Sequence, residues 1–197
     1  MSSFAVYSYF YSLIIKSMAK FYTSITKRLQ NFIEGQKIFF VATAPSNGRI
    51  NLSPKGMDTF RVINENKVLW LNVTGSGNET AAHLLENNNI TIMFCSFEGA
   101  PNILRLYGKG REIKPNDKDW DHVIPLFPVT PGTRQIFEID IDSAQTSCGM
   151  SIPFFEYKSE RNELNDWAKE KGTEGIQQYW EDKNQTSIDG FPTNLLN

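Results

Sequence analysis

The stretch TGSGNETAAHLLENNN, residues 74–89, has the composition of an anion-binding loop that leads into a helix. The first backbone N–H groups of a helix have no partner within it and attract negative charge. Gly75 and Gly77 would let the backbone approach a ligand closely. The pattern predicts a phosphate-type site, and a capped turn without any ligand remains the alternative. The side-chain donors would be Thr74, Ser76, Asn78 and Thr80.

The predicted loop contains no lysine or arginine, so positive charge must come from elsewhere in the chain. A charge-assisted hydrogen bond contributes about 1.5–3 kcal/mol, so lacking two of them costs an anion about 3–6 kcal/mol of binding free energy. Glu79 would add repulsion toward a dianion unless it turns away to cap the helix. Arginine suits bidentate phosphate binding, while a position facing outward from its strand is the alternative for each candidate. The candidate cations are Arg61, Arg105, Lys109 and Arg111.

The cysteines and histidines show no spacing that is typical of a metal site. Cys95 and Cys148 lie far apart in apolar or small-residue surroundings, and we interpret them as free thiols in a reducing compartment. His83 and His122 lie near neither each other nor a cysteine in the sequence. We therefore expect no metal site.

Short apolar segments bounded by turn residues predict six or seven strands, mostly linked as hairpins. The pair Asn47-Gly48 is a strong hairpin signal, so the segment at 50–56 should run antiparallel to the segment at 37–44. The other expected strands cover 59–63, 67–73, 90–97, 102–113 and 134–147.

Two of these expected strands carry further features. Gly108 and Gly110, inside the segment at 102–113, indicate a bulge or a bend of the kind that small barrels use at corners. The segment at 134–147 alternates apolar and polar residues, which predicts a strand with one face toward water. The side chains expected on that wet face are Ile136, Glu138, Asp140 and Asp142.

Helical periodicity predicts a few helices between and after the strands. The first should span 25–35, with Ser24 or Thr23 as its cap and Gly35 at its end. Strands joined by hairpins, with helices inserted, favour an α+β, mainly β fold: an antiparallel barrel with peripheral helices, and not a doubly wound sheet. The other expected helices cover 79–88, 116–127, 160–172 and 173–184.

The 197 residues are 40% hydrophobic and 21% charged, with a formal net charge of −2, as in one globular domain. Without a basic run we expect neither nucleic acid nor a membrane as partner. Residues 1–17 are apolar but too short to span a bilayer, and Lys16 is their only basic residue, which disfavours an organelle signal. We treat them as an extension outside the core and expect a cytoplasmic protein, with the nucleus as the other option.

Four segments together carry a family resemblance: ATAPSNGRINLSPKG, VLWLNVTGSGN, HLLENNNITIMF and ILRLYGKGREI. In this order they resemble the pyridoxamine 5′-phosphate oxidase-like proteins with the FMN-binding split-barrel fold, from about Phe21 to Tyr157. The resemblance implies a split antiparallel barrel at 18–157, FMN as cofactor, and a homodimer with the site between subunits. Residues 158–197 would be a helical extension that packs on the barrel or on the partner.

The resemblance also implies roles for particular residues. The strand INLSPKG would lie beside the flavin ring and contribute Ser53, Lys55 and Gly56, although a solvated lysine is the alternative for Lys55. Arg105 would balance charge, and a loop at Cys148 could reach the cleft. The matching segment after the strand WLNV would hold the flavin phosphate, through Asn72, Thr74, Ser76, Asn78 and Thr80.

The resemblance therefore implies an FMN-dependent oxidoreductase acting on a small molecule. The alternative is a split-barrel dimer that has lost FMN or binds another anionic ligand, since the loop lacks the usual Arg/Lys pair. A heme-binding relative is a third option, but no histidine is clearly placed as an axial ligand. Oxidation of pyridoxamine 5′-phosphate itself needs a second phosphate site. Arg161 is the only arginine after Arg134, so the sequence does not favour this particular activity.

Overall fold

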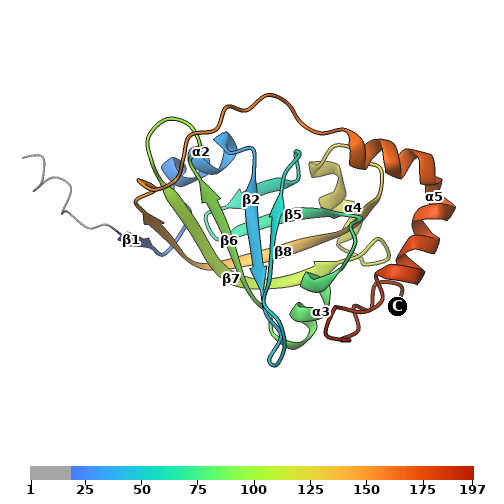
Figure 1. Cartoon of the computed structure of the whole chain (residues 1–197). Helices are drawn as coiled ribbons and strands as arrows, with labels where there is room; N and C mark the ends of the chain where they lie inside the picture. The colour runs from blue at the N-terminus through green and yellow to red at the C-terminus, as the bar shows by residue number, and fades with distance from the viewer. Residues whose placement is uncertain (1–18) are drawn as a thin grey trace, which may run out of the picture.

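An antiparallel sheet of eight strands forms the body of the protein in the computed structural model, which describes residues 19–197 (Figure 1). The strand order is β3-β2-β6-β7-β8-β5-β4, and β1 pairs with β8. The expected extension at 1–17 lies outside the described residues. The strands are β1 (Ala19–Tyr22), β2 (Phe39–Thr43), β3 (Asn51–Lys55), β4 (Phe60–Asn64), β5 (Lys67–Val73), β6 (Asn89–Cys95), β7 (Ile103–Ile113) and β8 (Thr133–Ser147).

The helices lie outside this sheet, and α5 runs along one side of it (Figure 1). They are α2 (Lys27–Gly35), α3 (Glu79–Glu86), α4 (Trp120–Val123), the 3₁₀ helix η1 (Ile124–Leu126) and α5 (Glu163–Lys183).

Two helix predictions need correction, and a third is confirmed. The cap of α2 is Thr26, whose hydroxyl accepts a hydrogen bond from the Leu29 N–H, and not Ser24 or Thr23. The helix expected at 116–127 is shorter, because only Trp120 to Leu126 form α4 and η1. The two helices expected at the end are both present: together they form α5, and they meet at Gly172, where the backbone is not helical (φ 63°).

The strand pairing follows the expected hairpins. β2 and β3 pair antiparallel across the Asn47-Gly48 segment, and β4 pairs with β5. The register of β7 and β8 shifts between Tyr107 and Gly108, which confirms the predicted bulge. A Cβ atom on Gly108 would lie 2.2 Å from the Asp140 carbonyl oxygen, so only glycine fits at this corner.

Aromatic rings close the curled sheet where no strand ladder does. The pairings of the described strands include none between β3 and β4, the two ends of the sheet. Instead the Phe39 ring of β2 lies 5.0 Å from the Phe60 ring of β4, and Phe60 lies 5.2 Å from Phe94 of β6. The barrel is therefore closed by side-chain packing on one side and by hydrogen bonds on the others.

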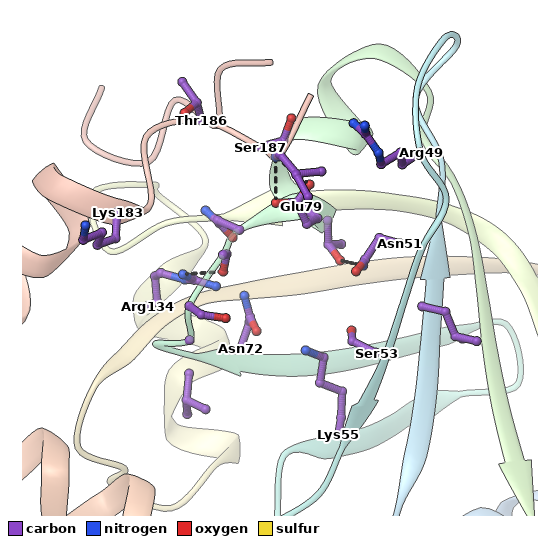
Figure 2. Close-up of a pocket in the computed structure, with 18 of the residues that line it drawn as sticks. Arg49, Asn51, Ser53, Lys55, Asn72, Glu79, Arg134, Lys183, Thr186 and Ser187 are labelled. Carbon is purple, nitrogen blue, oxygen red and sulfur yellow. Dashed lines mark hydrogen bonds between the residues drawn. The ribbon is translucent and has the colours of Figure 1, made fainter. Parts of the chain in front are cut away.

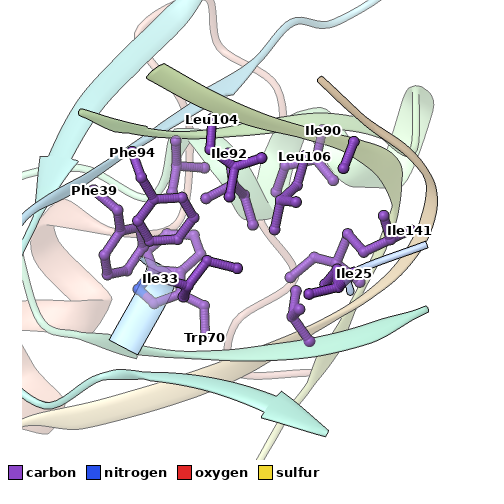
Figure 3. Packing of buried hydrophobic residues seen from close by; sticks show 14 of the residues in the cluster. Ile25, Ile33, Phe39, Trp70, Ile90, Ile92, Phe94, Leu104, Leu106 and Ile141 are labelled. Atoms are coloured by element: carbon purple, nitrogen blue, oxygen red, sulfur yellow. The ribbon is translucent and has the colours of Figure 1, made fainter. Parts of the chain in front are cut away.

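The main core fills this barrel with aliphatic and aromatic side chains (Figure 3). Trp70 of β5 stacks on Phe137 of β8, with ring centroids 4.9 Å apart. Each fully buried side chain of this size contributes about 1.5–3 kcal/mol to folding through the hydrophobic effect. Within residues 19–197, no helix has the combination of length and apolarity that a membrane span requires.

A second, smaller core lies under α4 and η1. It includes Ile136, which is fully buried and so does not belong to the wet face expected of β8. The helical turn that carries Phe127 covers this part of the sheet, which strand alternation alone does not indicate. The other buried members are Leu69, Leu71 and Ile113.

Candidate functional site

A pocket of about 710 Å³ opens between β3, β5, the start of α3 and the C-terminal segment (Figure 2). Its volume lies within the range of small-molecule sites, about 300–1,000 Å³. Six of the residues expected at a cofactor site line it together. They are Ser53, Lys55, Asn72, Ser76, Asn78 and Thr80.

Thr74 holds the loop from behind and does not line the pocket. Its N–H and its hydroxyl both donate to the Gly132 carbonyl oxygen, each at 2.8 Å. The indole N–H of Trp180 donates to the same hydroxyl at 2.8 Å. Gly132 adopts a φ of 71° here, so the turn that receives Thr74 favours glycine. These contacts fix the position of the loop relative to β8 and α5.

Asn78 presents an unused donor at the start of α3. Its Oδ1 accepts a hydrogen bond from Gln135 Nε2 at 2.8 Å, which fixes the orientation of the amide. Its Nδ2 is buried and has no partner among the described residues. The side chain occupies the cap position of α3 but makes no capping bond. A buried donor without a partner costs about 1–3 kcal/mol, which a bound acceptor would recover.

Arg134 is the buried cation of the pocket, and it is not among the cations expected from the sequence. It is 2% exposed, and its Nη1 donates to the Gly77 carbonyl at 3.1 Å and to Asn184 Oδ1 at 2.6 Å. Its Nε has no partner among the described residues. Burial lowers the pKa of Arg134 to about 10, so the guanidinium stays charged at neutral pH. The ladder places its neighbour Gln135 opposite Asn72.

Lys55 contributes a second cation on the opposite wall (Figure 2). Its Nζ lies 5.0 Å from the centroid of the Trp70 ring. Burial, and secondly the charge of Arg134, lower the pKa of Lys55 to about 8. No carboxylate among residues 19–197 forms an ion pair with it. Two cations that face one pocket favour an anionic ligand.

Glu79 is the carboxylate that was expected to repel an anion, and it is engaged elsewhere. Its two oxygens accept the Ile188 N–H at 3.1 and 3.2 Å. His83, whose Nε2 lies 3.9 Å from Glu79 Oε2, is buried and bonds through Nδ1 to Thr43. Thr80 Oγ1 accepts a hydrogen bond from Asn51 Nδ2 at 3.4 Å across the pocket.

Three other predicted site residues lie outside this pocket of the protomer. Gly56 follows Lys55, and its carbonyl accepts the Thr59 hydroxyl at 2.7 Å. Arg105 donates to the Ser147 hydroxyl at 3.1 Å, and the neighbouring Cys148 is exposed. Their roles at a flavin stay predictions.

The remaining candidate cations have partners on the surface. Arg61 pairs with Asp58 at 2.5 Å, and Lys109 donates to the Asn89 side chain. Arg111 bridges Glu138 and Asp119 at 2.8 and 2.9 Å. The cations that line the pocket are Arg49, Lys55, Arg134 and Lys183.

The donor set suits a phosphate-bearing ligand and not a metal ion. Hydroxyl, amide and guanidinium donors converge on one end of the pocket, while Lys55 and the Trp70 ring form the other. Among residues 19–197, no three His, Cys, Asp or Glu side chains are grouped so that they could hold a metal.

Comparisons with known proteins agree with this fold. The model of the pyridoxamine 5′-phosphate oxidase family matches residues 25–148, more than half of the chain. The pyridoxamine 5′-phosphate oxidase family protein ustO of Aspergillus flavus is 35% identical over 193 residues, covering 89% of this chain and 78% of that protein.

Two solved structures show the same fold. A candidate pyridoxamine 5′-phosphate oxidase of Lactobacillus delbrueckii superposes with a TM-score of 0.51 at 14% identity, over 62% of this chain and 94% of that one. HupZ of Group A Streptococcus gives 0.50 at 17% identity, over 61% and 97%. The mainly β split-barrel fold is thus confirmed, and the chain belongs to the pyridoxamine 5′-phosphate oxidase family.

Proposed function

We propose that the protein is an FMN-dependent oxidoreductase that acts on a small molecule. Family membership supports a flavin-type cofactor, and the pocket supports one that carries a phosphate. When bound, FMN would supply hydride or electron transfer, and the chain would bind and orient it.

The phosphate would lie at the start of α3. Ser76 and Thr80 offer hydroxyl donors there, and Asn78 and Arg134 offer the two donors that have no partner among the described residues. Lys55 would lie near the ring and favour negative charge on it, since a cation there stabilises a reduced flavin. The phosphate would thus lie at the hydroxyl, amide and guanidinium end of the pocket, and the ring would lie at the end formed by Lys55 and Trp70.

The observation that carries the proposal is the pair of orphaned donors, Asn78 Nδ2 and Arg134 Nε. Both belong to side chains that are 2% exposed and line the same pocket. Neither atom has a partner among the described residues, and the charged one favours an anion. Arg134 thus supplies the cation that the loop sequence lacks.

We also propose a homodimer whose second subunit covers the open side of the pocket. Three apolar side chains at the rim are exposed to solvent in the protomer: Ile50 at 76%, Leu52 at 63% and Ile188 at 72%. Exposed apolar patches of this kind are typical of protein interfaces. Sedimentation at micromolar concentration should give twice the mass of the chain, and a monomer would contradict this part.

A second candidate is a dimer without redox activity that binds another anion. The feature that favours it is Glu79, a carboxylate within the pocket wall where the loop lacks a basic pair. A thermal-shift screen separates the two, because FMN should stabilise the protein and other nucleotides should not. Stabilisation by another nucleotide instead of FMN would favour the second candidate.

We propose a cytoplasmic location for this activity. Cys95 and Cys148 are both free thiols in the structure, which suits a reducing compartment. We do not extend the proposal to pyridoxamine 5′-phosphate as substrate, because Arg49, the other arginine of the pocket lining besides Arg134, pairs with Asp189.

The proposal is tested by the visible spectrum of the purified protein and by titration with FMN. We expect a flavin band or the uptake of added FMN in the micromolar range or below. Arg134→Met should weaken FMN binding by about 10- to 100-fold, because a charge-assisted hydrogen bond is lost. The matched control, Arg111→Met, removes an arginine outside the pocket and should change the Kd less than about twofold. A wild-type protein that neither contains nor binds FMN would refute the proposal.

A further inference from the structure

The C-terminal segment, residues 184–197, packs over the phosphate end of the pocket. It has internal order of its own: Thr186 and Pro192 form a bridge, and the Thr193 hydroxyl donates to the Asn184 carbonyl at 2.7 Å. Asn184 and Thr193 are fully buried. Its residues Thr186, Ser187 and Ile188 line the pocket. The segment is therefore a wall of the site and not a loose tail.

Asn184 connects this segment to both the arginine and the loop. Its Oδ1 accepts from Arg134 at 2.6 Å, and its Nδ2 donates to the Gly75 carbonyl at 3.1 Å. One buried amide thus fixes the guanidinium relative to the backbone that would surround a phosphate. The arrangement leaves Arg134 Nε without a partner among the described residues.

The same segment controls where the Glu79 carboxylate points (Figure 2). Glu79 is the first residue of α3, beside Asn78 and Thr80, where a phosphate would lie. Both of its oxygens accept the Ile188 N–H, at 3.1 and 3.2 Å. A Cβ on Gly77 would lie 3.1 Å from Glu79 Oε1, so the carboxylate lies beside the loop while it accepts the Ile188 N–H. Among the described residues, the other polar group near this carboxylate is His83 Nε2, 3.9 Å from Oε2, so the Ile188 N–H is the contact that links it to the segment.

A second anchor keeps Ile188 in place. The side chain of Asp189 accepts the Arg49 N–H at 2.7 Å and pairs with the Arg49 guanidinium. Arg49 belongs to the turn between β2 and β3, so the segment is tied to the opposite wall of the pocket. The position of the Ile188 N–H is therefore fixed by its own bond to Glu79 and by the contacts of the next residue, Asp189, with Arg49.

We infer that the C-terminal segment makes the pocket selective for a phosphate monoester by engaging the Glu79 carboxylate in a hydrogen bond, with the Ile188 backbone N–H as the positioning group. The inference rests on the proposed function for the identity of the ligand. A carboxylate released beside a phosphate would repel it and weaken binding by about tenfold or more. A neutral ligand of the same shape would not be affected.

Ile188→Pro removes this N–H, and Ile188→Ala is the matched control that keeps it. We expect Ile188→Pro to raise the Kd for FMN at least about tenfold while the Kd for riboflavin, which has no phosphate, changes less than about threefold. Ile188→Ala should bind FMN as the wild type does. Adding Glu79→Gln to Ile188→Pro should restore FMN binding to within about threefold of the wild type. If Ile188→Pro does not fold, Asp189→Ala, which releases the other anchor, takes its place in the same series.

Unchanged FMN affinity in Ile188→Pro, equal losses for FMN and riboflavin, or no rescue by Glu79→Gln would each overturn the inference. A wild type that binds no FMN refutes the proposed function instead. In that case inorganic phosphate is the probe, measured by thermal shift on the same variants. Stabilisation that is lost in Ile188→Pro and regained with Glu79→Gln then supports the inference, and any other pattern overturns it.

Discussion

The strands β5 and β8 form one continuous ladder whose two ends differ in chemistry. At one end Trp70 pairs with Phe137 and Val68 with Ile139, all fully or almost fully buried. Two residues further along, Asn72 pairs with Gln135, and Arg134 precedes it. The same backbone geometry therefore supports a dry core and a buried polar cluster. The difference lies in what each end needs from the rest of the molecule.

The apolar end is complete without a ligand, and the polar end is not. Every ring of the core packs against other rings or aliphatic groups. In contrast, Asn78, Arg134 and Gln135 each keep a buried polar atom without a partner among the described residues. Burying such groups costs free energy, and a bound phosphate would offset that cost for the two donors, Asn78 Nδ2 and Arg134 Nε. We expect mutations at the apolar end to change stability alone, and those at the polar end to change stability and binding together.

The largest effect should come from Phe94→Ala at the apolar end. The ring is 2% exposed and contacts the rings of Phe39 and Phe60. Its removal leaves a cavity that should lower the free energy of unfolding by about 3–5 kcal/mol in urea titrations. The Kd for FMN of the folded fraction should change less than about twofold. A large loss of affinity would show that the two ends are not separable.

Asn184→Ala should have a smaller effect on stability but should also change binding. The substitution leaves Arg134 Nη1 and the Gly75 carbonyl without their buried partner. We expect about 2–3 kcal/mol less stability and a Kd for FMN about tenfold higher. Asn165→Ala on α5, away from the pocket lining, serves as the matched control. Normal FMN binding by Asn184→Ala would contradict a role of Asn184 in placing the guanidinium.

Because of Lys55, a rise in pH should increase the stability of the ligand-free protein and decrease its affinity for FMN. Its pKa is about 8 in the folded protein and about 10.4 when unfolded. Between these values the unfolded state holds more protons, so the stability of the ligand-free protein should rise with pH. Over the same range the neutral amine no longer attracts an anion, so the Kd for FMN should rise by up to about tenfold from pH 8 to 9.

Lys55→Met should remove both pH effects, which can be read from urea titrations and FMN titrations between pH 7 and 10. The variant should bind FMN more weakly at pH 7, with a Kd that stays constant to about pH 9, because Arg134 keeps its charge below its pKa of about 10. A wild-type affinity that does not change over this range would place Lys55 outside the ligand site.

The apolar end was predictable from the sequence because it depends on local patterns. Alternation and turn residues indicate β2, β3 and the bulge at Gly108 without knowledge of distant contacts. The exception, Ile136, is buried by Phe127, which a short helical turn brings over the sheet.

The polar end was predictable only in part. The glycines and hydroxyl side chains of the loop at 74–80 predict an anion site. No sequence pattern identifies the cation that belongs to it. Arg134 opens an alternating strand and resembles any solvated strand residue. Its role follows from contacts with Gly77 and Asn184, which lie 57 and 50 positions away in the chain. Such pairings arise from the packing of β8, α3 and α5, and no local pattern encodes them.

The measurement that tests the central claim most directly is the ratio of the affinities of the wild type for FMN and for riboflavin, taken by fluorescence titration at pH 7. The two ligands differ by the phosphate alone. If the α3 loop and Arg134 bind that phosphate, FMN should bind at least about 100-fold more tightly, and Arg134→Met should reduce the ratio to about tenfold or less. Equal affinities for the two ligands would contradict the account.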